Sequence, residues 1–132
     1  MHLHTLLIYN ITKYVSLTEE EKKLIVELFE IKNLKRKEKI LEIGNTNAPL
    51  AFINSGCLRS YSVDRHGYEH ILQFAPSDWW ITNMTSCINK SQSELCIEAI
   101  EPSQILEISR ENQLYLIEKV PSLSYYFWKL GE

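Results

Sequence analysis

Between residues 77 and 99 the sequence gathers neutral polar side chains directly after two tryptophans. The segment reads SDWWITNMTSCINKSQSELCIEA. Hydroxyl and amide groups beside an aromatic wall are typical of small-molecule pockets. The residues assigned to a ligand pocket and its wall are Trp79, Trp80, Thr82, Asn83, Met84, Thr85, Ser91 and Ser93. A structural interpretation stays open beside this one, in which the tryptophans fill the core of the β-roll and the hydroxyls cap a short helix.

Histidine pairs are the first candidates for a metal site. His2 and His4 form H-x-H near the N-terminus, and His66 and His70 form H-x3-H across an expected hairpin turn. Metal sites need three or four converging ligands, supported by a second layer of hydrogen bonds. Neither pair has a third partner nearby in the sequence, so we expect no bound metal.

The cysteines and the nucleophilic residues do not form a catalytic motif either. Cys57, Cys87 and Cys96 are scattered and include no C-x-x-C pair, which is typical of small apolar residues in a reducing compartment. The sequence contains no G-x-S-x-G, no phosphate-binding GK[ST] loop and no H-E-x-x-H. We therefore expect no enzyme. A cupin-type enzyme ranks last among the alternatives, because the H-x-H is at the N-terminus and not on a strand.

The elements that must position these residues change type along the chain. Thr18 and Glu21 form a capping box that predicts a helix over 18–30, and a weaker pattern predicts a helix over 3–14. Short apolar runs then alternate with turn residues such as Gly44, Gly56 and Gly67, which is typical of antiparallel strands. The predicted strands are 37–43, 50–53, 57–63, 68–74, 95–100 and 104–108.

The chain becomes helical again after residue 108. Ser109 is a good N-cap for one helix, and Pro121 ends it and suits the first turn of another. An apolar stripe at i, i+3, i+4 and i+7 follows, formed by Leu123, Tyr126, Phe127 and Leu130. Such a stripe needs a cover, which is either the chain's own barrel or a second subunit. We assign these four residues to a homodimer contact.

Composition limits the class of protein. The chain has 132 residues, 45% of them hydrophobic, and a net charge of −3. This length predicts one domain with a real core, and the acidic balance argues against a surface that grips nucleic acid by itself. No apolar run is long enough to span a membrane, and the N-terminus lacks the features of a signal peptide. We expect a cytoplasmic protein.

The spacing of glycines, aromatic residues and acids over 34–80 resembles a known pattern. The positions in register with it are Glu38, Gly44, Phe52, Ile53, Gly56, Tyr61, Asp64, Gly67, Glu69 and Asp78. The chain is similar over about 18–130 to the cyclic-nucleotide-binding β-roll of the catabolite-activator and fumarate-nitrate-regulator (Crp/Fnr) superfamily. The resemblance implies a mainly β fold with flanking helices, an antiparallel double-stranded β-helix of jelly-roll type. It also implies a dimer through the final helix and DNA binding by a C-terminal helix-turn-helix domain, which this chain does not contain.

The family's phosphate cassette, roughly fGE.all...pR.At, does not continue into this sequence. Alignment places Ile81 at the glycine, Thr82 at the glutamate and Ser93 near the arginine. The segment 77–99 contains no Arg, and its one cation is Lys90. A buried phosphate without a cationic partner costs several kcal/mol. The sequence therefore predicts no cofactor and argues against cyclic-nucleotide binding, while a smaller effector stays compatible with it.

The resulting hypothesis is a sensor domain over 1–132, with an N-terminal helix (18–30), a β-roll (34–108) and C-terminal helices (109–132) that begin a dimerisation helix. It would be the effector-sensing, dimerising part of a bacterial transcription regulator. The chain is either a fragment of that regulator or a stand-alone sensor, and we favour the fragment. The alternative function is a ligand-free scaffold that acts as a protein interaction module.

Overall fold

The structure is a computed structural model, and it describes residues 3–131. The helices are α1 (Thr5–Thr12), α2 (Glu19–Leu28), α3 (Met84–Asn89), α4 (Arg110–Lys119) and α5 (Ser122–Leu130). The strands are β1 (Glu30–Leu34), β2 (Lys39–Leu41), β3 (Leu50–Ser55), β4 (Cys57–Val63), β5 (Glu69–Pro76), β6 (Trp80–Ile81), β7 (Cys96–Ala99) and β8 (Ser103–Ile108). No helix in this part of the chain is long and apolar enough to cross a bilayer.

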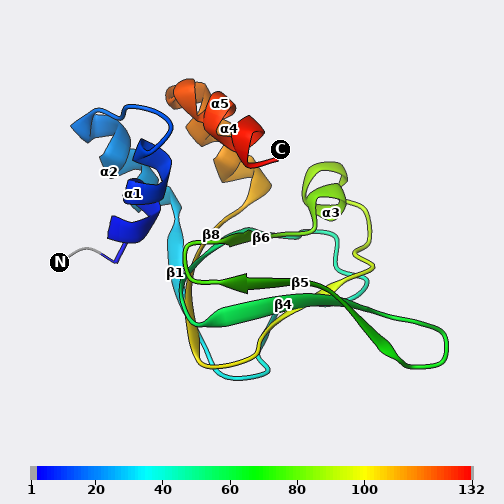
Figure 1. Cartoon of the computed structure of the whole chain (residues 1–132). Coiled ribbons are helices and arrows are strands. Elements are labelled where there is room, and N and C mark those ends of the chain that lie inside the picture. The colour runs from blue at the N-terminus through cyan, green and yellow to red at the C-terminus, as the bar shows by residue number, and fades with distance from the viewer. Residues whose placement is uncertain (1–2, 132) are drawn as a thin grey trace.

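The strands form two antiparallel sheets of four. The first has the order β1-β8-β3-β6 and the second β2-β7-β4-β5. Figure 1 shows α1, α2, α4 and α5 grouped on one side of the strands, with α3 apart from them and the β4–β5 hairpin extending away from the body. The predicted mainly β fold with flanking helices is confirmed.

Strand β3 of the first sheet is buried on both faces over residues 50–53. On β3, Ala51 and Ile53 lie in the core between the two sheets, whereas Leu50 and Phe52 lie in the core against the helices. Because successive side chains on a strand point to opposite faces, a strand between two cores must be apolar at every position. The run Leu50–Ile53 meets this requirement, and it explains why this strand shows no polar alternation.

The start of the roll differs from the prediction. The capping box forms, with Thr18 N donating to Glu21 Oε1 and Glu21 N donating to Thr18 Oγ1. The helix ends at Leu28, however, and residues 30–34 are already strand β1, paired with β8. Their sequence, EIKNL, is too short and too polar for its alternating pattern to be distinguished from the end of a helix by sequence alone.

The turn at Gly56 is the tightest of the glycine turns. Gly56 has φ of 89°, and a Cβ there would lie 2.2 Å from Ser103 Oγ and 2.7 Å from the carbonyl oxygen of Pro102. Gly67 has a similar φ of 86°, but nothing lies within 4 Å of its Cβ position. Comparing the same substitution at these two glycines therefore separates the cost of backbone strain from the cost of steric overlap.

We predict that Gly56→Ala lowers the free energy of unfolding by about 3 kcal/mol or more, because left-handed strain adds to a clash with backbone. The matched variant Gly67→Ala carries the strain alone and loses about 1 kcal/mol. Urea unfolding followed by circular dichroism measures both. Equal losses in the two variants would contradict the close approach of Gly56 to Ser103.

Candidate functional site

The polar residues around α3 hydrogen-bond to one another. Asn83 caps the helix by accepting from Ser86 N, and its Nδ2 donates to Ser93 Oγ at 2.9 Å. Ser93 Oγ in turn donates to the carbonyl oxygen of Leu95 at 2.8 Å. Because each group already has a partner, this part of the predicted pocket holds the loop around α3 together.

The remaining predicted pocket residues around α3 do not converge on one point. Thr82 Oγ1 donates to the carbonyl oxygen of Pro49 at 2.7 Å. Met84 and Thr85 are exposed, and Ser91 is half-buried. The cap of α3 is therefore the Asn83 amide and not one of the hydroxyls, and the polar residues lie on several separate surfaces.

The cation nearest to α3 in sequence is already paired. Lys90 Nζ lies 2.6 Å from Glu111 Oε2, which joins the end of α3 to the first turn of α4. A phosphate at α3 would have to compete with this carboxylate for the ammonium group. The contact therefore supplies no free positive charge where the cassette of the resembled family has its arginine.

The two tryptophans have different environments. Trp79 is 54% exposed, whereas Trp80 on β6 packs against the helices. The Trp80 ring centroid lies 5.1 Å from that of Phe52, 5.9 Å from Phe29 and 5.9 Å from Phe127. Trp80 thus fills the core between the first sheet and the helices, and not the interior of the roll.

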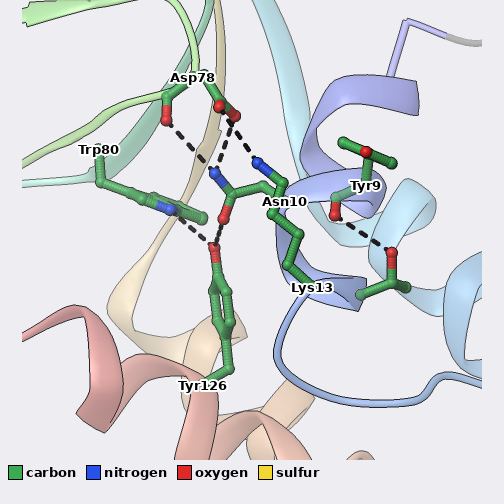
Figure 2. A network of polar contacts seen from close by, with 7 residues as sticks. Tyr9, Asn10, Lys13, Asp78, Trp80 and Tyr126 are labelled. Carbon is green, nitrogen blue, oxygen red and sulfur yellow. Dashed lines mark hydrogen bonds and ion pairs between the residues drawn. The ribbon is translucent and has the colours of Figure 1, made fainter.

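A polar network, formed by Asn10, Asp78, Trp80 and Tyr126, lies within this aromatic core (Figure 2). Trp80 Nε1 donates to the Tyr126 hydroxyl at 3.0 Å, and that hydroxyl donates to Asn10 Oδ1. Asn10 Nδ2 then donates to Asp78 Oδ1 at 2.9 Å. The network joins α1, the β5–β6 turn, β6 and α5, which are far apart in sequence. Tyr126 is fully buried, and burial raises the pKa of its phenol above the ordinary value.

Asp78 holds its place in the network through an unusual backbone. Its φ is 75°, a left-handed conformation that Asp and Asn adopt more readily than most residues. Asp78 N donates to the carbonyl oxygen of Ile53 at 2.8 Å, and Trp79 N to that of Pro76 at 3.2 Å. This turn aims the Asp78 carboxylate at α1, where Lys13 Nζ lies 3.8 Å from it.

Two cavities share Gln73, Trp80 and Leu130 in their walls. The apolar cavity has a volume of about 190 Å³ and is lined by Leu50, Gln73, Trp80, Ile81, Thr82, Met84, Gln113, Phe127, Leu130 and Gly131. The polar cavity has a volume of about 440 Å³ and is lined by Asn10, Lys13, Tyr14, Gln73, Asp78, Trp79, Trp80 and Leu130. Both have walls from the sheets and from α5, and both include predicted pocket residues.

The residues assigned to a dimer contact divide into two groups. Leu123 and Tyr126 are 0% exposed, because they pack into the core of their own chain. Phe127 is half-buried against Trp80, and Leu130 is 38% exposed. Leu123 and Tyr126 therefore belong to the intrachain core, and a partner would meet other residues. On the outer side of α5, Tyr125 is 50% and Trp128 64% exposed, with ring centroids 6.0 Å apart.

The histidines and cysteines form no cluster among residues 3–131. His70 Nε2 lies 2.8 Å from Asp64 Oδ2, and His4 is buried with its Nε2 2.9 Å from the carbonyl oxygen of Phe29. His2 lies outside the described residues. Cys87 and Cys96 are buried and Cys57 half-buried, all as free thiols. No group of three or more potential metal ligands occurs in the described part of the chain.

Comparison with solved structures identifies the architecture. The sensor domain of the transcriptional regulator DNR from Pseudomonas aeruginosa has a TM-score of 0.78 at 18% identity, over 97% of this chain and 85% of that one. The catabolite activator protein of Thermus thermophilus has a TM-score of 0.76 at 21% identity, over 92% of this chain. The fold is that of a cyclic-nucleotide-binding-like domain.

The c-di-GMP-responsive regulator CLP of Xanthomonas campestris shares this fold, with a TM-score of 0.73 at 15% identity over 86% of this chain and 56% of that one. The chain spans 55% of the length of the Thermus protein. No family model matches the sequence, and the search of curated proteins found no relative. The likeness is thus in three-dimensional structure at low sequence identity.

Sequence reasoning missed Asn10 and the role of Tyr126. Asn10 lies in a short helix that is mostly apolar, between Tyr9 and Ile11, and it is only 9% exposed. A lone amide on the buried side of such a helix must find partners. This isolated polar residue is the feature of the sequence from which the network could have been predicted.

We predict that Tyr126→Phe lowers the free energy of unfolding by about 1–3 kcal/mol, because the Trp80 N–H and the Asn10 carbonyl oxygen both lose a buried partner. The matched variant Tyr125→Phe, at a half-exposed position on the same helix, changes it by less than about 0.5 kcal/mol. Urea denaturation measures both variants. A loss of similar size in the two would show that the buried hydroxyl does not hold α5 in place.

Proposed function

We propose that this chain is the effector-sensing and dimerising domain of a bacterial transcription regulator of the Crp/Fnr type. The shared fold and the match to 85% of a regulator's sensor domain support this proposal. DNA binding would belong to a separate helix-turn-helix domain. The net charge of −3 agrees with a domain that does not hold DNA itself.

The observation that carries the proposal is the position of Trp80 between the roll and α5. It hydrogen-bonds Tyr126 of α5 and forms a wall of both cavities. A ligand in either cavity would touch the roll and α5 together. Such a ligand would favour one orientation of α5 over another, if it contacts the two orientations differently.

A ligand-free interaction module is the second candidate, and one observation favours it. The polar residues around α3 bond to one another, and the space between the sheets is filled by residues such as Ile53, Leu58 and Ile97. A roll without a vacant interior can act as a rigid scaffold. Ligand titrations separate the two candidates, because a scaffold responds to none of the tested compounds.

We predict that neither cAMP nor cGMP binds with a Kd of about 100 µM or tighter, because the α3 segment offers no arginine and Lys90 is held by Glu111. Isothermal titration calorimetry with each nucleotide is the measurement. The variant Ser93→Arg restores a guanidinium near the cassette position and serves as a comparison. Micromolar binding by the natural chain would contradict this reading of the cassette.

The dimerising part of the proposal depends on exposed aromatic residues of α5. We predict that the chain forms a homodimer and that Trp128→Ala weakens it by at least about tenfold, because exposed tryptophans that become buried dominate interfaces. Sedimentation velocity over a concentration series measures the dissociation constant. Tyr68→Ala, at a 70% exposed residue near the tip of the β4–β5 hairpin, is the control and leaves it unchanged. A natural chain that stays monomeric would overturn this part of the proposal.

A further inference from the structure

The polar cavity has one positive and one negative side chain in its wall. Of the residues that line it, the two charged ones are Lys13 and Asp78. Their charged atoms are 3.8 Å apart, and the side chains are 46% and 38% exposed. The apolar cavity, by contrast, has no charged residue in its lining. The two cavities therefore suit different ligands.

The Lys13–Asp78 contact is loose, because both side chains are partly open to water and Lys13 Nζ also lies 5.2 Å from the centre of the Tyr9 ring. An ammonium group has three donors and an ionised carboxylate about four acceptor positions. Asp78 Oδ1 accepts from Asn10, whereas Asp78 Oδ2 lies 3.8 Å from Lys13 Nζ. A separation of 3.8 Å exceeds the 2.7–2.9 Å of a strong charged hydrogen bond. A ligand with both charges can therefore gain two short contacts where the protein alone makes one long one.

The rest of the wall is aromatic and apolar. Tyr14, Trp79 and Trp80 supply aromatic side chains and Leu130 an aliphatic one. A ligand ammonium near Asp78 gains further from the face of a tryptophan. The volume of about 440 Å³ is within the range of small-molecule sites, which runs from about 300 to 1,000 Å³.

We infer that the polar cavity binds a small zwitterion of amino-acid type, with its carboxylate on Lys13 and its ammonium on Asp78. Ligands with a net charge gain one of these contacts and meet repulsion at the other, so the pair selects against them. The inference rests on the proposed sensing function and names the class of effector. The apolar part of the bound zwitterion lies along Trp79 and Leu130.

The polar network gives this site a path to α5. Asp78 accepts from Asn10, and Asn10 accepts from the Tyr126 hydroxyl. An ammonium on Asp78 changes the charge that Asn10 Nδ2 faces, and it does so two hydrogen bonds from α5. Because Tyr126 is fully buried, a movement of Asn10, the partner of its hydroxyl group, is transmitted to α5 and not absorbed by solvent.

Calorimetry with the proteinogenic L-amino acids and glycine betaine, each added singly to the 132-residue chain, tests the inference. We expect at least one to bind with a Kd of about 1 mM or tighter. Lys13→Gln and Asp78→Asn each weaken that binding by about tenfold, the loss of one charged contact. Asp78→Asn is the suitable variant because Asn also tolerates the positive φ and keeps an acceptor for Asn10. Lys23→Gln, at a 77% exposed side chain on α2, is the control and leaves binding unchanged.

No binding by any of these compounds at about 10 mM overturns the inference, and so does binding that Lys13→Gln and Asp78→Asn leave intact. Hydrogen exchange tests the path to α5: the bound zwitterion slows amide exchange in α5 more in the natural chain than in Tyr126→Phe, in which only the direct contact with Leu130 remains, and equal slowing in both overturns the path. The dimer measurement stays separate. A dimer that binds no zwitterion contradicts this inference alone, and a monomer that binds one contradicts only the dimerising role.

Discussion

The contact between Trp80 and Tyr126 joins strand β6 to helix α5. Strand β6 has only two residues, and backbone bonds to β3 fix it together with the turn before it. The position of its side chain relative to α5 is set by an indole packed among aromatic rings, with its N–H bonded to a fully buried hydroxyl. Aromatic packing of this kind adds about 0.5–1.5 kcal/mol per pair beyond the area it buries. The orientation of α5 therefore depends on side chains more than on the backbone.

A sheet buried on two faces is what makes this contact possible. The first sheet is covered by the second sheet on one side and by the helices on the other, so Ile81 points into the roll while Trp80 points to α5. Adjacent residues of one strand thus belong to different cores. A change beside Trp80 therefore affects the packing of the helices. The interior of the roll is filled by its own apolar side chains.

The sequence was sufficient for the fold and much less so for the site. The Thr18–Glu21 capping box, the Ser109 cap and the three glycine turns are local, and each formed as predicted. The site residues depend on which face of β6 meets which helix, and period-two alternation is invisible in a strand of two residues. For the same reason Leu123 and Tyr126 were assigned to a partner: an apolar stripe predicts burial but does not identify what buries it.

The polar residues of the α3 segment illustrate a general constraint on where a ligand can bind. A short helix between two loops leaves backbone groups unpaired, and the nearest hydroxyls and amides are taken up in satisfying them. Asn83 and Ser93 are used in this way, and Lys90 is neutralised by Glu111. Lys13 and Asp78 differ because their charged atoms are 3.8 Å apart, whereas those of Lys90 and Glu111 are 2.6 Å apart. Charged groups without a close ionic partner in the fold are the ones able to exchange an internal partner for a ligand. By that criterion the proposed ligand site lies between α1 and the β5–β6 turn, outside the roll, where a bound molecule would also contact the α5 helix through Leu130.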